Sequence, residues 1–383
     1  MAASQFTIYS SSDTFGPGPI NGLTGSLISI LNACLVNGYA GKPAVGWSKT
    51  SSLGILVSDL SGSVGAVPSL GCYTPPSGSM FTMVVNDMGG GGVAPTNSSG
   101  GREALITGWE NLLALTSSAP YTGSLGSGYG QFPLPTQLMM GNVVWRKSAT
   151  ADTTPRSWIM FADYYTMHLF IATGDTAGTY YGGSFGDVYS FRGSSDLFRC
   201  LLIGRAVISA SGAICSGVAT GALYDCFDST PINTQAVGAT ATLANISAFN
   251  ATPGHYMART WGSVGGASIN VSKVGDLGKA QAEGITVGAN QYNCWVFSGA
   301  IQTPNAPDNS LYLAPIQIGE VVENCLRGRW RGMYHICHSV TSFGDGQVFA
   351  GSGDFAGKQF YVIRSGTSGG MFAVEISNTV ETN

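Results

Sequence analysis

The stretch WIMFADYYTMHLFIAT, residues 158–173, decides the fold class of this chain. It consists of two short runs rich in aromatic and β-branched residues, which is the composition of β-strands. The two runs are separated by Asp163, Tyr164 and Tyr165, which are expected to form the turn. The stretch therefore predicts a β-hairpin.

Runs of the same kind recur along the chain, and each is bounded by Gly, Ser, Asp or Asn. We expect further strands at residues 80–86, 142–147, 187–191, 198–207, 256–261, 292–302, 311–319, 325–339, 358–364 and 371–377. No fixed-period repeat accompanies them, so a fibrous shaft is not expected. The chain is therefore predicted to be mainly β, with antiparallel sandwich- or barrel-like domains, one N-terminal helix and few other helices.

The one helix that the sequence predicts lies near residues 25–37. Its apolar residues recur at the spacing i, i+4, i+7 and i+8, which places them on one helical face. They are Leu27, Leu31, Cys34 and Leu35. We expect Thr24 to be the N-cap of this helix and Gly38 to stop it.

Composition divides the chain into three parts. From Ser209 to about Ala251, Ser, Ala, Gly, Thr and Asn dominate and few large apolar residues occur, which is typical of a linker or an extended surface insertion. We therefore predict a β-rich domain at residues 1–210 that contains the helix, a linker or insertion at 211–251, and a second β-rich domain at 252–383.

Charge is scarce in this chain. Charged residues make up 10% of the 383 residues, whereas ordinary soluble domains carry roughly 25%. A subunit covered by neighbours can replace surface charge with Ser, Thr, Asn and small apolar residues, and a secreted Gly/Ser/Thr-rich β protein fits the composition equally well. The amino terminus lacks a basic region followed by an apolar stretch, so we expect no signal peptide and synthesis in the cytoplasm. Together these features favour an assembly of several copies, such as a ring or a trimer.

Several other partners are not expected. The 17 basic and 21 acidic residues form no run of like charge, so no nucleic-acid partner is predicted. The longest apolar stretch, residues 27–36, is about half as long as a bilayer-spanning helix of roughly 20 residues, so no membrane span is predicted. The eight cysteines are widely scattered without a Cys-x-x-Cys pair, which favours buried reduced thiols over a disulfide framework.

Three segments, in this order, carry a resemblance. They are residues 31–47, which read LNACLVNGYAGKPAVGW; residues 169–190, which contain LFIATGDTAG and FGDVYS; and residues 326–379, which contain LRGRWRGMY, FAGKQF and EISNT. Together they resemble a family of virion-associated proteins from tailed bacteriophages that are described as structural or tail-related. The resemblance implies a component of the virion whose partners are other copies of itself and neighbouring virion proteins. It implies no catalytic residue.

The sharpest enzymatic motif is residues 366–370, which fit the pattern Gly-x-Ser-x-Gly around Ser368. A serine nucleophile needs a histidine base that a carboxylate orients. Of the four histidines, His168 lies inside an apolar run rather than in a loop far upstream. We therefore interpret the motif as a glycine-rich turn before the last strand.

Two further motifs concern metals and nucleotides. His335, Cys337 and His338 include soft metal ligands, yet a zinc site needs a second pair of ligands and none is apparent. Residues 351–358 miss the phosphate-binding loop pattern at two positions. We expect no catalytic residue, no cofactor and no metal site.

Arg327, Arg329 and Arg331 alternate with Gly328 and Trp330, which concentrates positive charge in a chain with 17 basic residues. In an extended segment the three guanidinium groups project from one face. One hypothesis is a solvated strand face. The other is an interface with carboxylates of a neighbouring subunit or phosphates of a host surface glycolipid. The candidate interface residues are Arg327, Arg329, Trp330 and Arg331.

The sequence leaves three functional hypotheses. The first is a tail-associated structural subunit, such as a collar, fibre or spike component, that acts through multivalent protein contacts. The second is a capsid decoration or cement protein. The third is a tail spike enzyme that degrades host polysaccharide, with Ser368 or an unidentified carboxylate pair as its agent.

Overall fold

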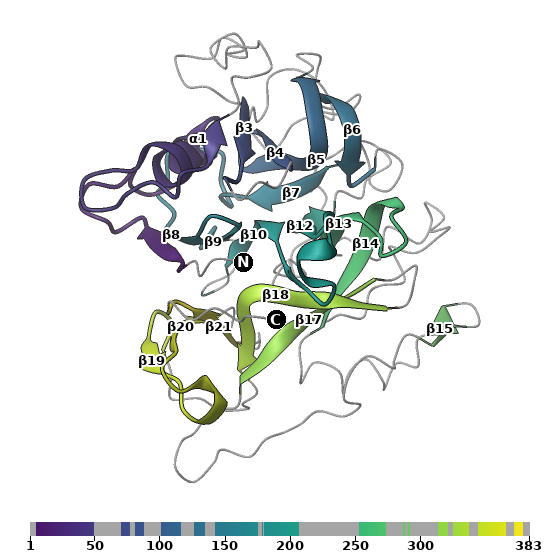
Figure 1. Ribbon diagram of the computed structural model, residues 1–383. Coiled ribbons are helices and arrows are strands. Elements are labelled where there is room, and N and C mark those ends of the chain that lie inside the picture. Colours follow the sequence, from purple (N-terminus) through teal and green to yellow (C-terminus); the bar gives the residue numbers. More distant parts are fainter. Residues whose placement is uncertain are drawn as a thin grey trace.

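A computed structural model describes residues 5–49, 70–76, 81–87, 101–115, 126–134, 142–174, 178, 180–206, 253–272, 286–287, 290–291, 313–320, 325–336, 344–364 and 371–377. In these ranges the chain is mainly β, its strand pairs are antiparallel, and one helical segment of more than one turn lies near the amino terminus. The predicted fold class is therefore confirmed. Figure 1 shows the elements in three layers, with the helix in the upper one.

The middle layer is a sheet in which each strand pairs with the next along the list. The strands are β1 (Thr7–Ser10), β8 (Trp158–Ala162), β9 (Thr166–Ile171), β10 (Tyr181–Asp187), β12 (Cys200–Ala206) and β13 (Pro253–Arg259). The predicted hairpin is the β8–β9 pair, in which Trp158 lies opposite Ile171. This prediction is confirmed.

Both faces of the middle sheet are buried. Along β8, Trp158 and Met160 point into the core beneath the upper layer, while Ile159 and Phe161 point into the core shared with the lower layer. A strand that is buried on both faces reads as a continuous apolar run instead of an alternating one. This explains why β8, WIMFA, is apolar at every position.

The upper layer contains the helix and a branch of the same sheet. Helix α1 (Ser26–Leu31) continues into a π-helical turn at Asn32–Asn37. The branch runs in the order β2 (Ser48–Lys49), β3 (Leu70–Thr74), β4 (Thr82–Asn86), β5 (Glu103–Leu115) and β7 (Val143–Arg146), with β6 (Gly126–Phe132) also paired to β5. Strand β7 pairs with β12 and so joins the branch to the middle sheet.

The helix ends where the sequence predicts but begins differently. Gly38 follows the last helical residue with φ at 69°, as expected of a stop. Thr24 is not the N-cap: that position is Gly25, which has no capping side chain. Instead the buried carboxylate of Asp87 accepts a hydrogen bond from the Leu27 N–H at 2.8 Å. No helix in the described residues is long and apolar enough to cross a membrane.

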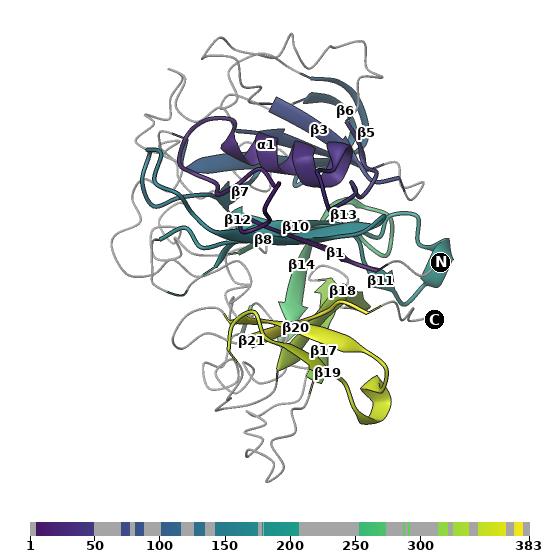
Figure 2. The ribbon, with the colours of Figure 1, turned by 90° about the vertical axis from the view of Figure 1, so that its left-hand side faces the viewer.

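The lower layer is a second antiparallel sheet, seen side-on in Figure 2. Its strands run in the order β14 (Gly265–Ser272), β17 (Leu313–Glu320), β18 (Cys325–Ile336), β21 (Met371–Glu375), β20 (Gln359–Arg364) and β19 (Val348–Ala350), and β11 (Tyr189–Ser190) also pairs with β18. Strand β14 pairs first with β13 and then with β17, so it passes from the middle sheet into the lower one. A separate small hairpin joins β15 (Thr286–Val287) and β16 (Asn290–Gln291).

The predicted strands that fall within the described residues all overlap observed ones, while the strand expected at 292–302 lies outside them. The whole of the expected linker, 211–251, also lies outside the described residues. The domain division stays a prediction. The strands on either side of the linker, β12 and β13, pair directly, with Leu202 opposite Tyr256, so the two predicted domains share one sheet.

Candidate functional site

Strand β18 carries the four candidate interface residues. The side chains of Arg327 and Arg331 are buried, with exposed fractions of 1% and 4%, and Arg329 is half-buried. Trp330 points to the core below the middle sheet, where its ring meets that of His168 edge-on at 5.6 Å. The hypothesis of a solvated strand face, one of the two that the sequence left open, is therefore wrong for Arg327 and Arg331. Whether the segment forms an interface stays a prediction.

Arg327 is the centre of a buried ion network. Its guanidinium group donates to Glu320 Oε1 at 2.6 Å and to Asp196 Oδ1 at 2.7 Å, and both carboxylates are almost fully buried. The ring of Trp261 lies 5.5 Å from the same guanidinium. Because an isolated charge is costly to bury, this arginine is stable here only with its carboxylate partners in place.

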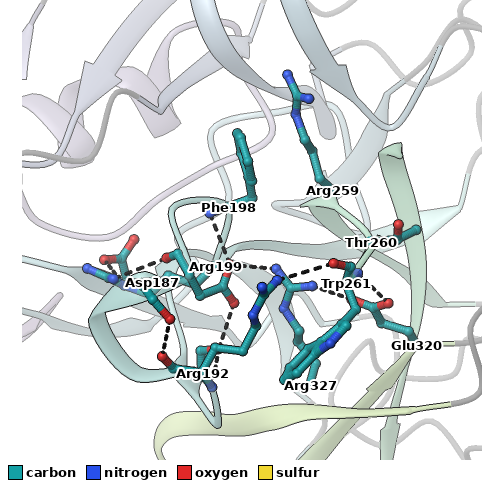
Figure 3. A network of polar contacts seen from close by, with 12 residues as sticks. Asp187, Arg192, Phe198, Arg199, Arg259, Thr260, Trp261, Glu320 and Arg327 are labelled. Atoms are coloured by element: carbon teal, nitrogen blue, oxygen red, sulfur yellow. Dashed lines mark hydrogen bonds and ion pairs between the residues drawn. The ribbon is translucent and has the colours of Figure 1, made fainter. Parts of the chain in front are cut away.

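The two carboxylates also hold the surrounding loops. Asp196 accepts hydrogen bonds from the Ser190 hydroxyl at 2.6 Å and from the Phe198 N–H at 3.1 Å. Glu320 accepts one from the Trp261 N–H at 2.7 Å. The loop between β11 and β12, the turn between β13 and β14, and the start of β18 are therefore joined around one arginine, as Figure 3 shows.

Two further arginines extend the network to its neighbours. Arg259 donates to both oxygens of Glu110 on β5, at 2.6 and 2.7 Å, and its guanidinium lies 4.3 Å from the ring of Phe198. Arg199 donates to Asp187 Oδ2 at 2.9 Å. Burial raises the pKa of Asp187, and the nearby Arg199 opposes that rise. These contacts tie the loop after β11 to the upper layer and to the end of β10.

Arg331, at the other end of the segment 327–331, is surrounded by a carboxylate and two aromatic rings. It donates two hydrogen bonds to Asp163 Oδ2. Its guanidinium lies 4.6 Å from the ring of Tyr165 and 4.9 Å from the ring of Tyr189. Such cation–π contacts add to the ion pair because the site is desolvated. The guanidinium therefore fixes the lower sheet to the turn of the β8–β9 hairpin.

His168 is a structural histidine by its contacts. Its Nε2 lies 2.9 Å from the Arg331 carbonyl oxygen, which can only accept, so Nε2 carries the proton and Nδ1 accepts from the Ser184 hydroxyl at 2.7 Å. Burial lowers the pKa of His168 to about 3. The ring is therefore neutral at physiological pH, and both nitrogens are occupied within the core.

The segments that form the network also carry exposed apolar side chains. Arg192 is exposed, donates to the Trp261 carbonyl oxygen at 3.2 Å and lies 4.8 Å from the indole ring. The exposed fractions of Phe191, Leu197, Val264 and Leu326 are 46%, 72%, 64% and 38%. We call this surface the Arg192 patch, formed by Phe191, Arg192, Leu197, Trp261, Val264 and Leu326. Sequence patterns did not point to it, because its residues come from three separate segments.

The described residues include only part of the other motifs that the sequence analysis considered. Ser368, Cys337 and His338 lie outside the described residues, and in the described part of the chain no group of three potential metal ligands occurs. The segment 351–358 forms a one-turn helix that leads into β20, whereas a phosphate-binding loop leads into a longer helix. The predicted buried free thiols are confirmed at Cys34, Cys72 and Cys200, while Cys325 is free but half-buried.

Comparison with known proteins adds no relative: no family model matches the chain, and no curated protein matches it. The resemblance to virion-associated phage proteins therefore stays a prediction from the sequence. What the geometry offers is a buried ion network that supports an exposed, apolar and positively charged patch.

Proposed function

We propose that this chain is a structural, non-enzymatic subunit of a tailed bacteriophage virion, associated with the tail, that acts through multivalent protein contacts. The observation that carries the proposal is the Arg192 patch, where exposed apolar side chains lie on the same three segments as an exposed arginine and the tryptophan it contacts. Arginine and aromatic residues dominate the centres of protein interfaces, and contiguous exposed apolar surface marks sites of interaction.

The distribution of charge supports the same proposal. Many charged side chains of the described residues pair inside the chain, as Lys147 does with Asp87 and Arg146 with Glu103. Charges that are buried in pairs do not hydrate the surface. A free monomer relies on interspersed surface charges for solubility, so a chain that has few charges and buries many of them is suited to a surface covered by neighbours.

The rigidity of the patch also favours an assembly role. Arg327, Asp196 and Glu320 are all at most 2% exposed, and the two carboxylates hold the backbone N–H groups of Phe198 and Trp261. Side chains that are already fixed before binding lose little conformational entropy when a partner docks. A preformed surface of this kind suits a protein that assembles once and then stays in place.

The number of copies per particle tests the proposal. Quantitative mass spectrometry of purified particles, calibrated with labelled peptides of this chain, gives that number. A small count that matches a ring or a set of tail fibres is the expected result. A count in the hundreds indicates the capsid decoration protein instead, and absence from the particle overturns the structural role.

The enzymatic alternative has its own test. The purified chain is incubated with host envelope polysaccharide, and the release of reducing ends is measured. We expect no release. Release that is lost in the Ser368→Ala variant, or in a carboxylate variant, contradicts the non-enzymatic part of the proposal.

A further inference from the structure

Arg192 differs from the other arginines around it. Four of them pair with a carboxylate of the same chain, namely Arg199, Arg259, Arg327 and Arg331. Arg192 is exposed, and in the described part of the chain its guanidinium contacts the carbonyl oxygen and the ring of Trp261 but no carboxylate. The Arg192 patch therefore presents an uncompensated positive charge among apolar side chains.

The chemistry of the patch selects a protein surface as its occupant. The indole ring of Trp261 already lies near two guanidinium groups, those of Arg192 at 4.8 Å and Arg327 at 5.5 Å, so a sugar ring would have to displace an arginine to stack there. Exposed Leu197 and Val264 offer apolar area that a free phosphate or a sugar leaves in water. A partner with a carboxylate beside small or apolar residues matches both features.

The chain itself carries such a carboxylate, Asp354. In the described residues the other carboxylates have a cationic or hydroxyl group of their own chain beside them, as Asp13 has Lys42, Glu375 has Lys358 and Asp345 has Tyr180. Asp354 is exposed and belongs to none of the ion pairs of the described residues. It lies in the one-turn helix Gly353–Phe355 after β19.

The segment after β11, which contains Arg192, and the one-turn helix after β19, which contains Asp354, lie on the same side of the molecule (Figure 2). In Figure 2 the coil that follows β11, in teal, and the coil near β19, in yellow, both lie toward the right-hand edge, and in Figure 1 neither is hidden behind the sheets. A face with opposite charges at two separate points is complementary to itself after a half-turn. In such a twofold contact, residue i of one copy meets residue j of the other, and the reverse.

We propose that two copies of this chain dock through this face, with Arg192 of each copy against Asp354 of the other and the apolar part of the Arg192 patch buried between them. The inference rests on the proposed function as an assembly subunit and names the partner. Each dimer then contains two Arg192–Asp354 contacts, so that one substitution changes the interface twice.

Charge reversal tests the pairing directly. The full chain and three variants, Arg192→Glu, Asp354→Arg and the double variant with both changes, are compared by sedimentation velocity over a range of concentrations. Each single reversal places like charges opposite each other and is expected to raise the dimer dissociation constant about tenfold or more. The double reversal restores opposite charges and is expected to restore association. Asp152→Arg, at another exposed carboxylate, is the matched control and is expected to leave association unchanged.

The outcomes separate this contact from the proposed function. A wild-type chain that stays a 39.6 kDa monomer throughout overturns the contact, as does a double variant that fails to regain association. Equal association of the wild-type chain and all three variants also overturns the contact. In each case the role as a virion subunit is decided separately, by the number of copies per particle. Circular dichroism of each variant tests whether lost association reflects unfolding, and a folded spectrum is expected for Asp354→Arg because its change lies in an exposed turn.

Discussion

Asp163 accepts two hydrogen bonds from the guanidinium group of Arg331, at 3.0 and 2.7 Å, although 168 residues separate the two in the sequence. The other oxygen of the same carboxylate accepts the N–H groups of Tyr165 and Thr166, both at 2.8 Å. One side chain therefore closes the turn of the β8–β9 hairpin and anchors the lower sheet to it. The hairpin turn therefore also connects the middle sheet to the lower sheet.

Replacing Asp163 with alanine is expected to lower the free energy of unfolding by about 3–5 kcal/mol, because it leaves a buried arginine without its partner. Denaturant-induced unfolding followed by tryptophan fluorescence measures the change. The matched control is Thr153→Ala, which truncates an exposed side chain and is expected to change the free energy of unfolding by no more than about 0.5 kcal/mol. Equal losses in both variants would contradict the role given to the Asp163–Arg331 pair.

The hairpin could be predicted from the sequence because its signal is local. The predicted run 158–162 has the same bounds as β8. Strand β10 was not predicted, because three of its seven residues are glycines, which are poor strand formers. At Gly182 a glycine is required by close approach of a neighbouring strand: a Cβ there would lie 2.1 Å from the Leu169 carbonyl oxygen. No local pattern encodes that approach.

The same limit explains the outcome at the candidate site. The alternation of Arg327, Arg329 and Arg331 was visible in the sequence, and their expected environment was solvent or a partner. The buried carboxylates that receive two of them, such as Asp163 and Glu320, come from different strands and turns. Which face of β18 is covered depends on how the lower sheet packs against the middle one, so the arginines could be located but their partners could not.

Gly183 tests the packing of β10. A Cβ at this position would lie 2.0 Å from Trp145 Nε1 and 2.2 Å from the Ile203 carbonyl oxygen, two atoms that are joined by a hydrogen bond of 2.8 Å. Gly183→Ala is therefore expected to lower the free energy of unfolding by about 1–3 kcal/mol or more. Gly344→Ala, where a Cβ meets nothing within 4 Å, is the control. Urea unfolding of both variants makes the comparison, and a Gly183→Ala chain as stable as the control would contradict the packing described.

The buried His168 predicts a dependence of stability on pH. Its pKa is lowered to about 3 in the folded chain, from an ordinary value of 6.5, so the unfolded chain binds a proton between these values and the folded chain does not. Its contribution is therefore complete above pH 6.5 and is lost as the pH falls toward 3, by about 1.4 kcal/mol per pH unit. His168→Gln removes this titration. The difference in unfolding free energy between the two chains should shrink steadily from pH 7 to 4, and a constant difference would refute the assignment.

The helix start offers the most discriminating double variant. The buried Asp87 carboxylate pairs with Lys147 and also accepts the Leu27 N–H; burial raises the pKa of Asp87 and lowers that of Lys147, while each opposes the shift of the other. Lys147→Met leaves the carboxylate buried without a countercharge and is expected to cost about 3–5 kcal/mol of unfolding free energy. Adding Asp87→Asn removes the charge and keeps an oxygen for the Leu27 N–H, so most of the loss should be recovered. Asp87→Leu with Lys147→Met lacks that oxygen and should recover less, by about 1 kcal/mol. Equal stability of the two double variants in denaturant unfolding would show that Asp87 acts through its charge alone and does not cap the helix.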